Sequence, residues 1–244
     1  MNFNDHIDQI SERYRATVLG LKGVLGIALH SEAPLSQKTK KELINKLNKV
    51  ASGAISDLRL LVREAIIDAV SLSYDIALNN DYAIDELSVE WETLTDAIED
   101  AEKDLFDDLV SRVNKDVSQT IDFYNRFRLN VMARTLLGEA EQRHLIVSER
   151  EKMLSGTSYK FLDNTGKRYD SSYYVSKRVA HSMYVMQRRA MYYLLVSMKQ
   201  NKAQIQNPMR PNDRKVIELI DYFNHEIELF NYNSRALLVK SLVT

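Results

Sequence analysis

The sequence predicts an all-α protein, built as an elongated bundle of long helices with one small β-hairpin near residues 159–169. Three observations lead to this class. Apolar residues recur at steps of three and four along most of the chain, which is the spacing of one helix face. The prolines, Pro34, Pro208 and Pro211, leave residues 35–207 without a residue that forbids a helix interior. Finally, 45% of the 244 residues are hydrophobic, which is enough for a substantial core.

The first predicted helix covers residues 4–30. Gly20, Gly23 and Gly26 occupy every third position within it. A dinucleotide-binding loop would need a preceding strand, and none is predicted there. We therefore interpret these glycines as positions where the backbone of another helix comes close.

Two long helices and a shorter one follow. After a turn at residues 31–36, the second helix continues to about Leu78. The third begins in an acidic stretch after a turn at residues 79–81. It can end at Gly138, because glycine is favoured just after a helix C-terminus. The shorter helix is predicted for residues 140–155.

The passage FLDNTGKRYD, residues 161–170, does not have helical spacing. Its β-prone runs flank a turn at residues 163–166, with Asp at the first position and Gly at the last, as tight turns prefer. We therefore predict a hairpin here. One of the polar residues at 170–172 can then cap a long helix that runs to about Asn201.

The predicted domain organisation has three parts. Residues 1–206 form the helical bundle with the hairpin inserted in it. Residues 207–213, NPMRPND, have the composition of a linker, and residues 214–244 form a C-terminal helix.

Charge is segregated along the chain, although the formal net charge is only -1. Residues 81–108 contain twelve carboxylates and one lysine, a net charge of -11. Residues 126–215 contain eighteen Lys or Arg against seven Asp or Glu, a net charge of +11. Such a separation of charge gives information about binding partners, and it gives little information about the fold.

The basic residues of the hairpin and the following helix are the candidate interaction surface. Cations interleaved with tyrosines suit a protein interface or a nucleic-acid backbone. A solvated basic face that pairs with the acidic segment is an equally weighted alternative. Because the opposing charges nearly cancel, this pairing, within the chain or between copies, is favoured over non-specific contact with DNA. The candidate residues are Lys167, Arg168, Tyr169, Lys177, Arg178, His181, Arg188 and Arg189.

The sequence contains no motif typical of a catalytic, cofactor-binding or metal site, so we expect a protein that is not an enzyme and that has no cofactor. Cysteine is absent, which excludes thiolate chemistry and suits a reducing compartment. Glu141 and His144 form one Glu-x-x-His pair. A ferritin-like di-iron site needs two such pairs and two further glutamates, so a solvated helix surface is the favoured interpretation.

No membrane segment is predicted. The first residues lack the basic-then-apolar order of a signal peptide, and no apolar run reaches the roughly 18–20 residues of a membrane span. We therefore expect a soluble protein.

The order of motifs around the hairpin resembles the minor head, or head-morphogenesis, proteins of tailed bacteriophages. Gly138 closes a helix, the run Asp163-Asn164-Thr165-Gly166-Lys167-Arg168-Tyr169 follows, and Tyr174-Val175 lies at the start of a long basic helix. The likeness covers about a quarter of the chain. Many members have a larger aromatic residue at the position of Tyr169 and continue into a Cys/His-containing or enzymatic region. Here NPMRPND and one predicted helix follow instead.

The resemblance implies a non-enzymatic virion component, a minor capsid protein that associates with the portal or the capsid interior. It would assist head assembly, genome packaging or delivery, and would be found in the virion and, during assembly, in the host cytoplasm. The alternative is a soluble bacterial helical-bundle adaptor or regulator whose acidic segment binds a basic partner. A ferritin-like metal enzyme is the third hypothesis, and it rests on Glu141 and His144 alone.

Helix length predicts self-association or attachment to a larger assembly. At about 1.5 Å of rise per residue, the second helix and the helix through Val131 are too long for a compact bundle of this size to cover both ends. Apolar surface near those ends should remain for another chain. We therefore expect a homo-oligomer or several copies within a larger assembly.

Overall fold

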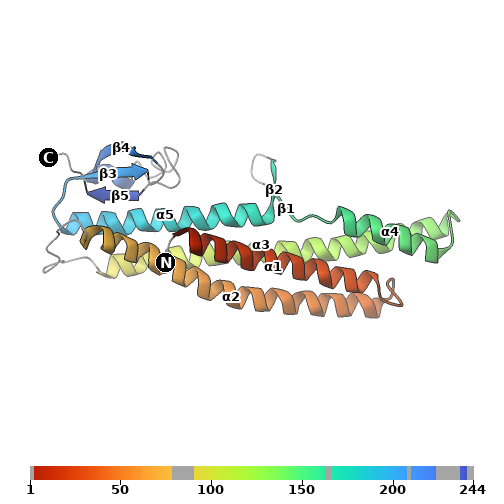
Figure 1. The fold of residues 1–244 in the computed structure, drawn as a ribbon. Coiled ribbons are helices and arrows are strands. Elements are labelled where there is room, and N and C mark those ends of the chain that lie inside the picture. The colour runs from red at the N-terminus through yellow and green to blue at the C-terminus, as the bar shows by residue number, and fades with distance from the viewer. Residues whose placement is uncertain (1–2, 79–90, 163–165, 208–209, 224–236, 241–244) are drawn as a thin grey trace. The chain divides into compact units, whose positions relative to one another are not determined.

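The computed structural model describes residues 3–78, 91–162, 166–207, 210–223 and 237–240, and the turn predicted at residues 79–81 lies outside them. Most of these residues lie in five helices, which confirms the predicted, mostly helical class (Figure 1). No helix within the described ranges is long and apolar enough to cross a membrane. The helices are α1 (Phe3–Leu29), α2 (Gln37–Leu78), α3 (Trp91–Leu136), α4 (Gln142–Gly156) and α5 (Ser171–Ser197).

Local hydrogen bonds fix where the helices begin and end. Ser36 precedes α2, and its Oγ accepts a hydrogen bond from the Thr39 N–H at 3.0 Å. Gly138 follows α3 with a φ of 69°, the left-handed conformation that glycine favours, and two backbone hydrogen bonds close a Schellman motif around it. The prediction that Gly138 ends this helix is confirmed.

Helix α5 ends earlier than predicted, at Ser197 rather than near Asn201. Lys199 adopts a φ of 56°, and its N–H donates to the Val196 carbonyl at 2.9 Å. This is the same helix-ending motif with lysine at the position where glycine is usual. The sequence therefore carried no recognisable stop signal.

The predicted hairpin is confirmed. Strands β1 (Lys160–Leu162) and β2 (Arg168–Asp170) pair antiparallel. Gly166, just before β2, has a φ of 81°, which explains why glycine stands there. The other predicted turn residues, 163–165, lie outside the described part of the chain.

A second sheet replaces the predicted linker and C-terminal helix. Strands β3 (Lys202–Asn207), β4 (Arg210–Glu218) and β5 (Leu237–Lys240) form an antiparallel sheet in the order β4-β3-β5 (Figure 1). The predicted linker is therefore wrong at residues 207 and 210–213, and the predicted helix is wrong at residues 214–218 and 237–240. Residues 219–221 form the 3-10 helix η1 (Leu219–Asp221), and residues 222–223 are helical. Residues 224–236, in the middle of the predicted helix, lie outside the described part.

Burial explains why the helical interpretation failed in this region. The apolar residues Ile217, Ile220 and Phe223 are spaced as on one helix face. Instead, Ile217 is buried in β4 between the exposed Val216 and Glu218, which is the two-residue period of a strand, and Ile220 in η1 is 90% exposed. Ile217, Ile220 and Phe223 are apolar whether this segment is a helix or a strand, so hydrophobicity alone could not distinguish the two structures.

The chain divides into two compact units, which are described separately. The hairpin unit consists of residues 11–59 and 108–175, and the sheet unit of residues 1–10, 60–107 and 176–244. Their boundaries fall within α1, α2, α3 and α5, and not at the boundary predicted near residue 206.

The hairpin unit has a core of side chains from α1, α2 and α3. All of these side chains are at most 1% exposed, and each contributes roughly 1.5–3 kcal/mol by leaving water. Gly20 of α1 faces α2 closely, since a Cβ built there would lie 3.2 Å from Val50 Cγ1. The core includes Tyr14, Leu21, Leu25, Leu43, Leu47, Leu58, Val113, Tyr124, Phe127 and Val131.

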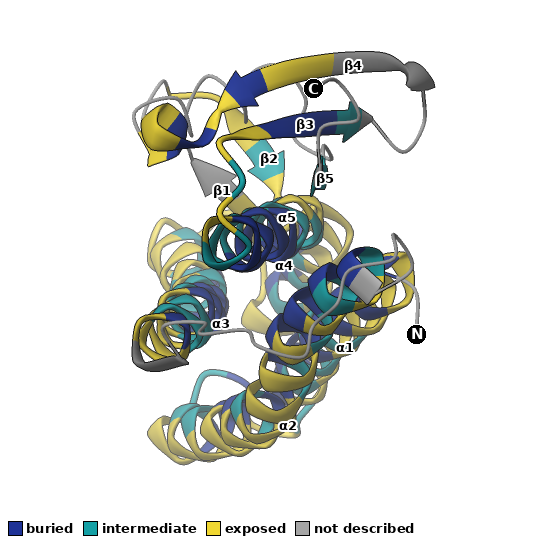
Figure 2. Ribbon diagram, turned by 90° about the vertical axis from the view of Figure 1, so that its left-hand side faces the viewer, coloured by how far each residue is buried: buried dark blue, intermediate teal, exposed yellow. Residues whose placement is uncertain are grey.

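In the sheet unit, α5 is buried over most of its surface from Ser182 onward (Figure 2). Phe3 of α1 packs edge-on against Tyr184, with ring centroids 5.1 Å apart. Ser73 of α2 donates a hydrogen bond to the Gln187 carbonyl at 2.9 Å. Helix α5 is therefore the centre of this unit, and it has no wide solvent-exposed face there.

The buried side chain of Gln187 also holds the edge of the sheet. Its Nε2 donates to the Leu238 carbonyl at 3.2 Å, and its Oε1 accepts from the Leu238 N–H at 3.1 Å. Leu238 lies in β5, the strand at one edge of the described sheet. One side of β5 pairs with β3, and Gln187 binds the opposite side. The amide thus satisfies strand groups that a further strand would otherwise bind.

The glycines of α1 give a test of helix contact. A Cβ at Gly23 would meet no atom within 4 Å, so Gly23→Ala should raise the free energy of unfolding by about 0.5–1 kcal/mol, because alanine loses less backbone entropy in a helix. Gly20→Ala should gain less or lose stability, since Val50 must move. Urea unfolding of both variants checks this, and equal gains would contradict the close contact at Gly20.

Candidate functional site

The hairpin is anchored to the core of its unit at its base. Tyr159, which precedes β1, is buried, and its hydroxyl shares a hydrogen bond with Thr120 Oγ1 of α3 at 2.7 Å. Burial raises the pKa of Tyr159 to about 12, so the hydroxyl stays protonated. The Ser171 N–H donates to the Tyr159 carbonyl at 3.2 Å, and Gln119 Nε2 donates to the Lys160 carbonyl at 3.1 Å. The strands therefore leave the core at a fixed position.

The outer part of the hairpin presents cations beside stacked tyrosines. Lys160, Lys167 and Arg168 are exposed. Tyr169 stacks on Tyr173 with a centroid distance of 6.0 Å and an interplanar angle of 13°, and Lys167 Nζ lies 5.1 Å from the centroid of the Tyr169 ring. The last distance is within the range of a cation–π contact. Lys167, Arg168 and Tyr169 lie together as predicted, whereas Lys160 was missed because it precedes the turn motif.

Asp170 joins the hairpin to α5 and is the cap among the three residues that the sequence offered. Its Oδ1 accepts hydrogen bonds from the N–H groups of Ser172 at 2.9 Å and Tyr173 at 3.3 Å. The carboxylate is thereby bound to the helix N-terminus, where negative charge is favourable. The strand and the helix consequently keep a defined angle.

The five predicted site residues on α5 belong to the sheet unit and do not form one exposed basic face. Lys177 is exposed, while His181 and Arg189 are half-buried. Arg188 is 0% exposed, so its assignment to an outward surface is wrong. The prediction assumed one polar helix face, but α5 is surrounded by other elements of its unit at this level.

Arg178, the last of these residues, pairs with the acidic segment of the same unit. Its Nη2 donates to the carboxylate of Asp104 in α3, and its Nη1 donates to Ser182 Oγ at 2.9 Å. This is the pairing within the chain that the charge distribution favoured. It involves an exposed carboxylate, so it contributes only about 0–1 kcal/mol.

A buried polar cluster that the sequence did not reveal lies beneath the hairpin. Its centre is the carboxylate of Asp116 in α3, which is 0% exposed. Three groups donate to it: the hydroxyl of Tyr14 in α1, the guanidinium of Arg112 one turn earlier, and Ser171 Oγ at 3.3 Å. The available signal was a series of polar residues, 112, 116 and 120, at helical spacing inside an apolar stripe.

Burial sets the protonation of this cluster. Burial raises the pKa of the Asp116 carboxyl, and the hydrogen bonds from Tyr14, Arg112 and Ser171 oppose that rise. Burial beside the carboxylate likewise raises the pKa of Tyr14 far above its usual range. The tyrosine therefore remains a donor, and the cluster links α1, α3 and the first residue of α5.

Comparison of the chain with known protein families, curated proteins and solved structures finds no significant match. The resemblance to phage minor head proteins consequently stays a prediction from the order of motifs.

The Glu-x-x-His pair lies at the surface. Glu141 directly precedes α4 and His144 is in its first turn, and both side chains are exposed. A di-iron site would need them inside a bundle. In the described part of the chain, no three His, Asp or Glu side chains are grouped as metal ligands would be.

An ion-pair network attaches α4 to α3. Glu149 is nearly buried, and it accepts hydrogen bonds from Arg134 Nη1 at 2.7 Å, Lys152 Nζ at 3.2 Å and Asn130 Nδ2 at 3.5 Å. Burial alone would raise the pKa of Glu149, but these donors together hold it below its ordinary value. The ionised carboxylate therefore stabilises the contact.

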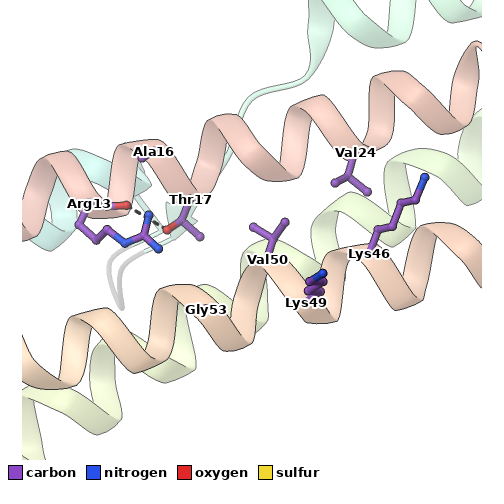
Figure 3. A pocket seen from close by; sticks show the side chains of 8 residues that line it. All are labelled: Arg13, Ala16, Thr17, Val24, Lys46, Lys49, Val50 and Gly53. Atoms are coloured by element: carbon purple, nitrogen blue, oxygen red, sulfur yellow. Dashed lines mark hydrogen bonds between the residues drawn. The ribbon is translucent and has the colours of Figure 1, made fainter.

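A groove of about 460 Å³ lies between α1 and α2 of the hairpin unit (Figure 3). Arg13, Lys46 and Lys49 line it with positive charge, and Arg13 pairs with Asp57 at 2.5 Å. The apolar lining residues are Ala16, Val24 and Val50.

Removing one donor tests the buried cluster. Tyr14→Phe should lower the free energy of unfolding by about 1–3 kcal/mol, because the buried Asp116 carboxylate loses a hydrogen bond without gaining water. Tyr169→Phe, on the hairpin, is the matched control and should change it by less than about 0.5 kcal/mol. Urea unfolding measures both. Equal small effects would show that Tyr14 does not stabilise Asp116.

The Glu149 network predicts a pH dependence. The folded-state pKa is lowered, so its stabilisation is present above the ordinary value of 4.5 and is lost as the pH falls through the folded-state pKa. Glu149→Gln should lower the free energy of unfolding by about 1 kcal/mol at pH 7, and this difference should shrink as the pH falls below 4.5. Glu151→Gln, which is exposed on the same helix, is the control. A pH-independent difference would contradict the ionic contribution.

Proposed function

We propose that the protein is a non-enzymatic structural component of a phage virion, and that its hairpin attaches it to the portal or the capsid interior. The observation that carries this proposal is the rigid mounting of an exposed basic hairpin with stacked tyrosines. The same segment, Gly166 to Tyr169 followed by a long helix, carries the resemblance to minor head proteins.

The way the hairpin is held favours binding. Tyr159, Gln119 and Asp170 each fix it by a hydrogen bond to a neighbouring helix or its end. A surface that is already ordered loses little conformational entropy when a partner binds. The binding free energy of the contacts at Lys167 and Arg168 is then not offset by an entropic cost of ordering the strands.

The composition of the hairpin favours an acidic protein surface over DNA. Tyrosine and arginine are enriched at the centres of protein interfaces. Of the predicted DNA-contacting cations, Arg188 is buried and Arg178 is paired with Asp104, which leaves fewer phosphate contacts than a basic helix would offer. Portal or capsid protein is therefore the proposed partner, with several copies in the particle.

The adaptor hypothesis remains the second candidate, since Arg178–Asp104 pairing neutralises only part of the acidic segment. Asp96, Glu99 and Asp100 on α3 are exposed and could bind a basic partner. Mass spectrometry of purified particles from the source separates the two. The virion proposal expects the chain in the particle, and its absence would favour the adaptor.

A double substitution tests the hairpin itself. Lys167→Gln with Arg168→Gln should reduce incorporation into particles about tenfold or more, because both cations lie at the proposed contact. Lys38→Gln with Lys41→Gln removes the same charge from exposed positions of α2 and should leave incorporation unchanged. Unchanged incorporation of the hairpin variant, with thermal unfolding like that of the control, would overturn the assignment of this surface.

A further inference from the structure

Helix α4 is attached to the rest of the hairpin unit by few apolar side chains. Leu145 and Glu149 are its buried residues, and Met153 is half-buried. These three residues are spaced by four, which places them on one face of the helix. A carboxylate therefore stands at the centre of the face by which α4 is attached, where an apolar side chain is usual.

One arginine of α3 binds both α4 and the turn that precedes it. Arg134 donates through Nη1 to Glu149 at 2.7 Å and through Nε to Glu139 at 2.6 Å. Lys152 and Asn130 are the further donors to Glu149. Burial disfavours the ionised form of this carboxyl, but the donors, with Lys152 first, more than offset it and lower the pKa of Glu149. Protonation of Glu149 would remove the charge that attracts Arg134 and Lys152, so the attachment of α4 depends on that charge.

Both ends of α4 carry a glycine at which the helix can turn away from the unit. Gly138, between α3 and α4, has a φ of 69°, and Gly156 is the last residue of α4. Glycine adopts a wide range of backbone angles, as a hinge requires. Beyond Gly156, Tyr159 is held in the core by its hydrogen bond to Thr120. The segment between the two glycines can therefore move while the chain on either side stays in place.

The end of α4 covers part of α1. A Cβ built at Gly26 would lie 3.9 Å from Leu154 Cδ2, which is ordinary van der Waals contact. The titratable groups of α1 on either side of Gly26 have contacts of their own. Lys22 Nζ lies 6.0 Å from the centroid of the Tyr159 ring, and His30 Nδ1 hydrogen-bonds the Gly26 carbonyl at 2.8 Å. The contact of α4 with α1 is thus apolar, and the charged contact of α4 is the one with α3.

We propose that α4 is a strap whose release is controlled by the charge of Glu149. It lies on α1 and α3 while Glu149 is ionised, and its opening as a unit, between Gly138 and Gly156, is favoured when Glu149 is protonated. Opening exposes the sides of α1 and α3 around Gly26 and Asn130, so acid changes the surface of the unit while its core stays folded. Segments with few buried apolar contacts are the ones that open locally. The inference does not depend on the virion proposal, because it concerns the purified chain alone.

Hydrogen exchange of the full chain, measured by mass spectrometry and divided by the intrinsic exchange rate at each pH, tests the strap. At pH 7 the amides of residues 142–156 should exchange faster than those of residues 43–58, which lie in the core-forming part of α2. Low urea should accelerate only the exchange of residues 43–58, because local opening exposes little surface. Lowering the pH to about 3.5, below the ordinary carboxyl pKa, should increase the opening of residues 142–156. If both segments showed the same urea dependence, α4 would not open by itself and the proposal would be overturned.

Matched variants separate the charge of Glu149 from the general effect of acid. At pH 7, Glu149→Gln should increase the opening of residues 142–156 about fivefold, because the amide keeps the size of the side chain but loses the ion pairs with Arg134 and Lys152. Glu151→Gln removes the same charge from an exposed position of α4 and should leave the opening unchanged. In Glu149→Gln, lowering the pH should have little further effect on residues 142–156. Equal effects of the two variants, or an undiminished pH response in Glu149→Gln, would refute control by Glu149.

Discussion

The buried carboxylate of Asp116 is the constraint on which the hairpin unit depends. An ionised group removed from water costs several kcal/mol unless other groups solvate it. Tyr14, Arg112 and Ser171 provide that solvation, and they come from α1, α3 and the start of α5. Any arrangement that separated these elements would leave a buried charge without its donors. The cluster thereby selects one relative placement of the elements, which apolar packing alone specifies less strictly.

Hydrogen bonds from this cluster hold the base of the hairpin in position. Ser171 binds Asp116 through its side chain and the Tyr159 carbonyl through its backbone N–H, so one residue connects the buried charge to the base of β1. Thr120 repeats this connection, since its hydroxyl bonds the Asp116 carbonyl at 2.7 Å and the Tyr159 hydroxyl. The exposed Lys167 and Arg168 are thus mounted on a core contact rather than on a free loop. A proposed binding surface with this support is ordered before its partner arrives.

Charge and apolar surface have separate roles in the two units. In the sheet unit, Arg178 and Asp104 pair across α5 and α3, so part of the segregated charge is used within the fold. In the hairpin unit, Leu129, Met132 and Leu136 remain exposed although their helix is otherwise well packed. The exposed cations of the hairpin and these exposed apolar residues of α3 thus differ in chemistry on one unit.

The sequence alone determined the features that depend on neighbouring residues. The helices before residue 198, Gly138 at a helix end, the hairpin around Gly166 and a cap at 170–172 follow from local spacing and backbone preference, and the structure confirms them. Only the tertiary structure decided what depends on distant partners. Val216 and Ile217 are apolar in a helix or a strand, and pairing with β3 places them in a strand. Arg188 is charged, so the sequence predicts an exposed position for it on α5, yet the elements packed around α5 bury it. Asp116 interrupts an apolar stripe of α3. Its role as the acceptor of a buried cluster depends on Tyr14, which lies 102 residues away in the sequence and donates to its carboxylate in the folded chain.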